Sequence, residues 1–303
     1  MAGNSTRAIL IALGANFAIA VAKGVAAFFT GSGAMLAETV HSLADCGNQG
    51  LLLLGMKQAK LPPSPEYPLG RGKEIYFWSF LVAVMLFTVG GVYSLYEGWH
   101  KLQHPEPLSQ WWWAAGVLAF AIAVEAYSTY AALAIAGKER RGRSYWRWFR
   151  ESRQAELIVI VGENIAALLG LVFALAAVLL SVATGNPMWD ALGTLAIGLL
   201  LIVVAVFVAI EVKAMLVGQS ADPVVQRKIL EFLEARPAIR RVVSLVTLQL
   251  GDEIMVSIQA QMRPPEGTEA ADEFELIDRI EQALRQVFPQ VRWIFFEPDN
   301  DPD

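Results

Sequence analysis

Long apolar stretches dominate the first two thirds of the chain. A helix needs about 20 mainly apolar residues to cross the hydrocarbon core of a bilayer. Six segments have this length, at 8–30, 34–56, 75–97, 112–136, 157–182 and 189–217. The pattern therefore predicts six transmembrane helices. The first is expected to be a retained span, because it is too long for the core of a signal peptide.

From residue 218 the pattern changes to shorter amphipathic segments. Asp222-Pro223 is typical of a helix start, and β-rich runs follow at Arg241–Leu250 and Ile254–Met262. Helical spacing returns over 269–288, and Val291–Phe296 is a last expected strand. The order α-β-β-α-β predicts a small α+β domain of the ferredoxin-like kind.

Composition and charge agree with this division. The chain is 55% hydrophobic and 17% charged, whereas globular proteins average about 25% charged residues. Residues 218–303 hold 16 acidic and 9 basic residues, net −7, which leaves net +2 for residues 1–217. We expect a transmembrane domain at 1–217 and a cytoplasmic domain at 218–303, and no nucleic-acid partner. One cysteine, Cys46, excludes an internal disulfide and a Cys-based zinc finger.

The basic residues predict the orientation of the spans. The connections 57–73 and 138–153 contain eleven Lys and Arg, whereas those on the opposite side contain only Lys101. The positive-inside rule places both termini and the tail in the cytoplasm. We expect an integral protein of a lipid bilayer, in a bacterial cell inner membrane.

Ionisable side chains in the second span are the first candidates for chemistry. Such a group at the bilayer centre costs roughly 2.5–3.5 kcal/mol on insertion scales. His41 and Asp45 are four residues apart, so they share one helix face. An imidazole and a carboxylate at that separation can bind one divalent cation. The alternative is a buried His–Asp hydrogen bond that ties two helices together, and we favour metal ligation.

The fifth span adds Glu163 and Asn164, at a depth that can match that of Asp45. Two carboxylates and an imidazole resemble zinc sites with three protein ligands and a fourth position for water or another donor. We predict His41, Asp45 and Glu163 as ligands. Asn164 and Asn48 are candidate neutral oxygen donors. The alternative for Glu163 is to cap the helix or to extend toward the interface.

Four further ionisable groups lie in expected spans and are interpreted as structural. Lys23 can pair with a carboxylate or extend toward the interface. Glu125 and Asp190 are expected to stabilise helix packing, and Glu211 can reach water near the interface.

Several motifs resemble the cation diffusion facilitator family. His41-Ser42-Leu43-Ala44-Asp45 is similar to its second span. The runs Gly31–Glu38 and Asn186–Asp190 are similar to its entries to the second and sixth spans. Tyr67–Glu74 and the pair Glu163-Asn164 most resemble a branch related to zinc transporter nine.

This resemblance implies a homodimer that exchanges a divalent metal for protons by alternating access, with the tails dimerising. His41 and Asp45 match the family's ligands in the second span. The fifth span departs from the usual HxxxD or DxxxD, because Val159 and Ala167 stand one turn before and after Glu163. The related branch has Glu-Asp where this chain has Glu163-Asn164, which leaves the fourth ligand open.

Together, these observations predict a proton-coupled efflux transporter of a divalent cation, with zinc as the first choice of metal and protons as counter-ion. Metal binding requires neutral imidazole and ionised carboxylate, so it releases protons. This donor set also suits manganese, iron, cobalt or nickel, and a non-transporting metal sensor or scaffold is a further alternative. An enzyme is not expected, because an HExxH-like motif and a Ser-based elbow are both missing from the sequence.

Overall fold

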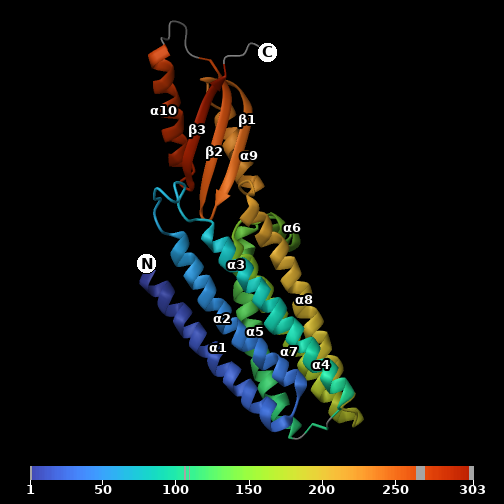
Figure 1. Cartoon of the computed structure of the whole chain (residues 1–303). Helices are drawn as coiled ribbons and strands as arrows, with labels where there is room; N and C mark the ends of the chain where they lie inside the picture. Colours follow the sequence, from blue (N-terminus) through green and yellow to red (C-terminus); the bar gives the residue numbers. More distant parts are fainter. Residues whose placement is uncertain (1, 106, 109, 264–269, 300–303) are drawn as a thin grey trace.

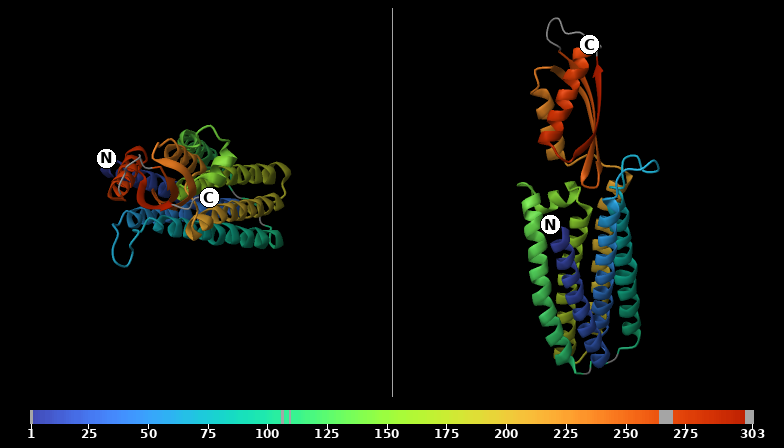
Figure 2. Two further views of the ribbon diagram at one scale, coloured as in Figure 1. Left: turned by 90° about the horizontal axis from the view of Figure 1, so that it is seen from above. Right: turned by 90° about the vertical axis from the view of Figure 1, so that its left-hand side faces the viewer.

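The computed structural model describes residues 2–105, 107–108, 110–263 and 270–299. A bundle of long helices carries a small sheet domain, the tail, at one end (Figure 1). The side view at the right of Figure 2 also places the tail beyond this end of the bundle. The bundle elements are α1 (Ala2–Thr30), α2 (Gly33–Ala59), α3 (Glu74–Met85), the π-helix η1 (Leu86–Val92), α4 (Tyr93–Gln103), α5 (Trp111–Glu139), α6 (Tyr145–Glu151), α7 (Ala155–Thr184) and α8 (Met188–Val217).

Among the described residues, four helical stretches are long and apolar enough to cross a membrane: Glu74–Gln103, Trp111–Glu139, Ala155–Thr184 and Met188–Val217. They correspond to the third to sixth predicted spans and confirm a membrane-type helical domain. α1 has a shorter apolar stretch, Asn16–Thr30. α2 is 27 residues long, but its polar and ionisable residues dilute its apolar character. The full count of six spans therefore stays a prediction.

The third predicted span is helical throughout but changes its winding in the middle. α3 is followed directly by the π-helix η1 at Leu86, and α4 continues the same helix from Tyr93. η1 contains Gly90 and Gly91. A Cβ at Gly91 would lie 2.5 Å from Cγ1 of Ile202 in α8, so only glycine permits this approach. A single π turn inside a long helix often lies at a functional site.

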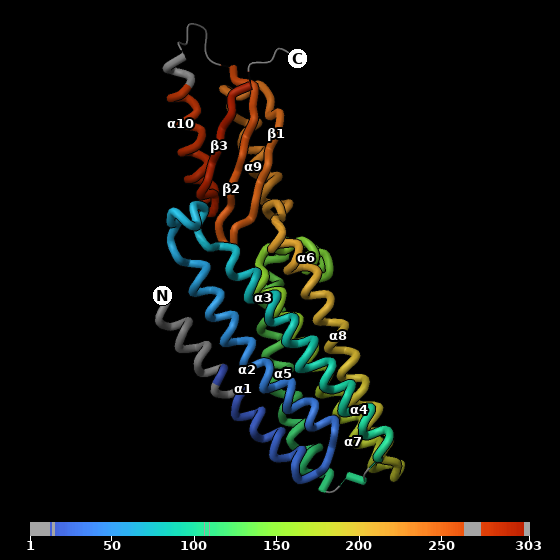
Figure 3. The backbone as a smooth tube through the Cα atoms, in the orientation of Figure 1, coloured from blue at the N-terminus to red at the C-terminus, as the bar shows by residue number. Residues whose placement is uncertain are grey.

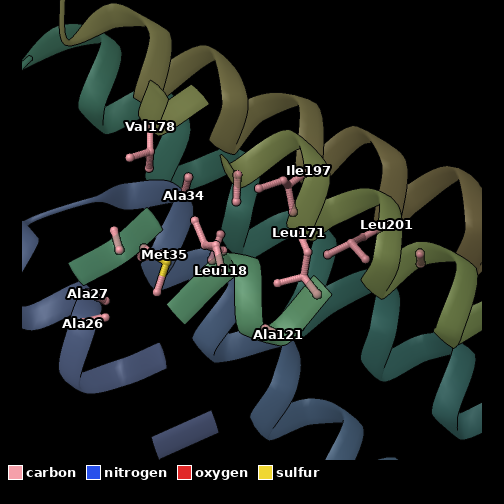
Figure 4. Close-up of a cluster of buried hydrophobic side chains, with 14 of the residues drawn as sticks. Ala26, Ala27, Ala34, Met35, Leu118, Ala121, Leu171, Val178, Ile197 and Leu201 are labelled. Atoms are coloured by element: carbon pink, nitrogen blue, oxygen red, sulfur yellow. The ribbon is translucent and has the colours of Figure 1, made fainter. Parts of the chain in front are cut away.

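Small side chains allow the helices to approach closely in the centre of the bundle. Ala34 and Met35 of α2 pack with Leu118 of α5, Leu171 of α7 and Ile197 of α8 (Figure 4), and all five are buried. Lipid tails are as apolar as these side chains, so van der Waals packing of small residues holds helices together in a bilayer.

The start of α2 is fixed by a carboxylate from α8. Ser32 caps α2, where its hydroxyl accepts a hydrogen bond from the Met35 N–H (3.2 Å) and donates one to Asp190 (2.6 Å). Asp190 also accepts from the Gly33 N–H (2.7 Å). A carboxylate at a helix N-terminus is favoured by the helix dipole. The packing role predicted for Asp190 is confirmed, and this cap fixes the depth of α2 relative to α8.

The tail contains α9 (Pro223–Glu234), β1 (Ile239–Leu250), β2 (Glu253–Met262), α10 (Ala270–Val287) and β3 (Val291–Asp299). β1 pairs with β2 antiparallel, and β2 pairs with β3 parallel, so the sheet is small and mixed. The element order agrees with the prediction, although residue 269, the expected start of the second helix, lies outside the described residues. The ferredoxin-like assignment stays a prediction.

Several polar contacts attach the tail to the bundle, among them a hydrogen bond from Arg153, before α7, to the carbonyl oxygen of Ser220 (2.7 Å). The Gly251 N–H, in the β1–β2 turn, donates to the Tyr76 hydroxyl of α3 (2.9 Å). Arg143, before α6, donates to Asp222 at the start of α9 (2.9 Å). The β1–β2 turn also packs so closely against Gly72 that a Cβ there would overlap the carbonyl oxygen of Leu250.

Gly72→Ala is therefore expected to displace the β1–β2 turn and to break the hydrogen bond between Gly251 and Tyr76. Loss of one such bond corresponds to about tenfold faster amide exchange at Gly251. Hydrogen exchange of the full chain measures this. Gly116→Ala in α5 is the control, because a Cβ there meets nothing within 4 Å. Unchanged protection of Gly251 in Gly72→Ala would contradict the contact.

Candidate cation site

A polar cavity of about 60 Å³ lies among α1, α2, α5 and α7. Its lining includes the carboxylates of Asp45, Glu125 and Glu163 together with the ammonium of Lys23. Neutral polar residues complete it: Asn16, Ser42, Gln49, Ser128 and Asn164. Ionisable groups at membrane depth are costly and normally face a bundle interior or a water-filled cavity. This cavity is the natural place to test the predicted ligands.

Asp45 lines the cavity, whereas His41 is not among its lining residues. The His41 Nε2 is 3.6 Å from an Asp45 carboxylate oxygen. His41 is fully buried, and a Cβ at Gly90 of η1 would lie 3.8 Å from its Nδ1. Among the described residues, neither ring nitrogen of His41 has a hydrogen-bond partner, nor has Oδ1 of Asp45. Such buried groups cost about 1–3 kcal/mol each when unsatisfied, and a cation bound by the imidazole and the carboxylate would offset this cost.

Glu163 and Asn48 contact each other across α2 and α7. The Asn48 side-chain amide donates a hydrogen bond to Glu163 Oε1, and both residues are buried. The side-chain oxygen Oδ1 of Asn48 has no hydrogen-bond partner in the described part of the chain. The structure thus brings together two candidates that the sequence placed on different helices.

Asn164 lines the cavity but is engaged with α5. Its side-chain amide donates to the Ser128 hydroxyl (3.0 Å), and its backbone carbonyl accepts from Thr129 (3.3 Å). The amide oxygen is thereby oriented by α5 rather than by α2.

The five predicted residues do not converge on one point in this conformation. Among the described residues, no group of three or more His, Cys, Asp or Glu side chains is arranged to hold a metal ion. Their positions explain this. Asp45, Glu163 and Asn164 line the cavity, whereas His41 and Asn48 are not among its lining residues.

Lys23 forms a buried ion pair beside the cavity. Its ammonium lies 3.2 Å from Glu38 Oε2 and donates to the Ser42 hydroxyl at 2.7 Å. Lys23 and Glu38 are almost completely buried. The carboxylate partner expected for Lys23 is therefore present, and it is Glu38.

Sequence reasoning did not select Glu38 or Gln49 and treated Glu125 as a packing residue. Glu38, Ser42, Asp45 and Gln49 recur at i, i+4, i+7 and i+11, which is one polar stripe along α2. That spacing could have identified the cavity side of the helix. Glu125 lacked such a signal, because it is the one acidic residue within an otherwise apolar span.

The structure is a bundle of apolar helices around a carboxylate-lined cavity, with a small sheet domain at one end. This arrangement is typical of membrane transport proteins. The family model described as "Cation efflux transmembrane domain" matches residues 9–217. The chain belongs to the cation efflux family. This confirms the predicted resemblance.

Several relatives are named as transporters. Proton-coupled zinc antiporter SLC30A9, mitochondrial, of Mus musculus is 29% identical over 333 residues, covering 96% of this chain and 58% of the relative. The Xenopus laevis protein of the same name is 35% identical over 76% of this chain and 41% of the relative. Cation-efflux pump FieF of Klebsiella pneumoniae is 25% identical over 94% and 89%. The chain thus spans about half the length of the SLC30A9 relatives.

These comparisons test two predictions, that the chain is not an enzyme and that it lies in a bacterial cell inner membrane. Members of this family are transporters, so the expectation that the chain is not an enzyme is confirmed. The expected bacterial cell inner membrane is contradicted, because SLC30A9 relatives from four vertebrates are named as mitochondrial. The physical reason is that charge bias orients helices within a membrane but carries no information on which membrane holds them.

Proposed function

We propose that this chain moves a divalent metal cation, zinc first, across a membrane in exchange for protons. The observation that carries the proposal is the cavity of Asp45, Glu125 and Glu163 inside a membrane-type helical bundle of the cation efflux family. The SLC30A9 relatives are named as proton-coupled zinc antiporters, which supports both the metal and the proton coupling.

The proposed ligands are His41, Asp45 and Glu163, with oxygen donors from Asn48 and Asn164. Imidazole and carboxylates suit zinc and also manganese, iron, cobalt or nickel. His41 lies next to Asp45 but is not among the residues that line the cavity, so loading requires its ring to move toward the ion. Its ring lies against Gly90 of η1, so a change of winding in η1 is the simplest movement that frees it.

Proton exchange follows from the chemistry of these donors. A metal ion requires neutral imidazole and ionised carboxylates, so loading releases protons and protonation expels the metal. We propose that the cavity alternates between the two sides of the membrane, and that the metal is carried from the tail side to the opposite side. α1 and α2 complete six spans over residues 1–217.

We further propose a homodimer joined through residues 218–303, which we interpret as a ferredoxin-like domain. α9 and α10 cover one face of the sheet (Figure 1). Val246 and Phe295 remain 56% and 53% exposed. An exposed apolar sheet face is a surface that a second copy of the tail can cover.

Metal flux into sealed proteoliposomes under an imposed pH gradient tests this function. The full chain is expected to take up zinc faster when the lumen is more acidic than the medium, and excess manganese, iron, cobalt or nickel should compete less than excess zinc. If one of those metals is transported faster than zinc, that metal replaces zinc as the proposed substrate. Metal binding without flux would contradict transport and favour a sensor or scaffold.

A further inference from the structure

An apolar groove of about 260 Å³ lies where α5, α7 and α8 meet the short helix α6. It shares no lining residue with the polar cavity. None of its lining side chains is charged. Ile165 and Phe207 are 37% and 42% exposed, so the groove opens on the outer surface of the bundle. Its walls are formed by Leu133, Phe149, Val161, Ile165, Val204 and Phe207.

Aromatic residues of α6 form the edge of this groove. Trp146 is 61% exposed, and its ring packs edge-on against Phe207 at 5.8 Å between centroids. Tyr145 is 45% exposed. α6 lies at the tail end of the bundle (Figure 3), where the apolar helices end. Trp and Tyr at this level are typical of the interface between acyl chains and headgroups.

A group of basic residues lies beside the same edge of the groove. Residues 138–153 contain seven Lys and Arg but only two Glu. Arg147 and Arg143 both bond to Glu151; the hydrogen bond from Arg147, supported by Arg143, lowers the pKa of Glu151 below its ordinary value. Glu151 is therefore ionised and already neutralises part of this charge.

Arg140 and Arg141 have no carboxylate partner in the part of the chain that the structure describes. The Arg140 guanidinium lies over the Tyr145 ring, 5.0 Å from its centroid, so it stands directly next to the groove. The guanidinium donates a hydrogen bond to a backbone carbonyl, that of Arg143 (3.0 Å). The charge complementarity of this edge favours an anion.

We propose that the groove binds one acyl chain of an anionic phospholipid, whose phosphate lies at Arg140. The apolar walls hold the chain, the aromatic edge lies at the headgroup boundary, and the guanidinium of Arg140 selects a negative headgroup. Basic pockets between membrane helices bind anionic lipids in this manner. The site is independent of the cation site.

Native mass spectrometry of the full chain with phosphatidylglycerol or phosphatidylcholine tests the site. We expect tighter retention of phosphatidylglycerol. Arg140→Gln should weaken it about fivefold, the effect of one basic residue near an anionic lipid, without changing retention of phosphatidylcholine. Arg279→Gln is the charge-matched control, because Arg279 lies in α10 and its side chain is 70% exposed.

Ile165→Trp fills the groove and should reduce retention of both lipids, in protein whose thermal unfolding is unchanged. If the variant unfolds early, Val204→Phe makes the same test from α8. Equal retention of the two lipids by the original chain would overturn the proposal. So would an Arg140→Gln variant that behaves like Arg279→Gln, or a second copy of the chain that occupies the groove.

Discussion

Asp45→Asn and Glu163→Gln each reduce pH-gradient-driven zinc uptake by about 100-fold or more. Each substitution keeps the size of the side chain but removes a carboxylate from the cavity. Replacing even an outer partner of a metal ligand typically costs 10–100-fold, so loss of a direct ligand falls at or beyond the upper end. Initial rates of zinc uptake by reconstituted protein give the measurement.

Glu97→Gln is the matched control for this pair. Glu97 lies in α4 and is not among the residues that line the cavity. It undergoes the same chemical change within the same membrane domain. Uptake should therefore stay near that of the original chain. Undiminished uptake in both Asp45→Asn and Glu163→Gln would reject the ligand assignment, whatever the control shows.

Lys23→Met destabilises the membrane domain by about 3–5 kcal/mol, which is the second large effect. It leaves Glu38 buried without its cation, and removing one partner of a buried ion pair costs this much. The Ser42 hydroxyl also loses the hydrogen bond from Lys23. Denaturant unfolding of the full chain in detergent, followed by helical signal, measures the change.

The double variant Lys23→Met/Glu38→Gln separates charge from shape. It removes both charges of the pair, so most of the lost stability should return, since a buried pair replaced as a whole is often close to neutral. A double variant as unstable as Lys23→Met alone would mean that packing, rather than the unpaired carboxylate, sets the effect.

The sequence predicts most of the fold because the long apolar runs of residues 1–217 differ strongly from the short amphipathic segments of residues 218–303. The apolar runs of α5, α7 and α8 predict their positions within a few residues, and the strand pattern predicts β1 and β2 closely. It does not predict η1, because a π turn depends on the close approach of Gly91 to α8. Nor does it predict that Gly72 packs against the β1–β2 turn, since that contact joins two separate parts of the chain.

The candidate site is predicted less completely. Helical spacing correctly places His41 and Asp45 one turn apart. It does not give the rotation of α2, which turns Asp45 toward the cavity and His41 toward η1. The pairing of Asn48 with Glu163 and the partner of Lys23 depend on contacts between helices. Those contacts follow from how whole helices pack, which local patterns do not encode.

The most direct test of the central claim measures both ions at once. Proteoliposomes that contain the full chain, with no initial pH difference, are given an outward zinc gradient while internal pH and zinc are followed together. Exchange through the Asp45–Glu163 cavity predicts that zinc leaves as protons enter, so the lumen acidifies, and that Asp45→Asn abolishes both signals. Zinc that leaves without any change of internal pH would contradict the account.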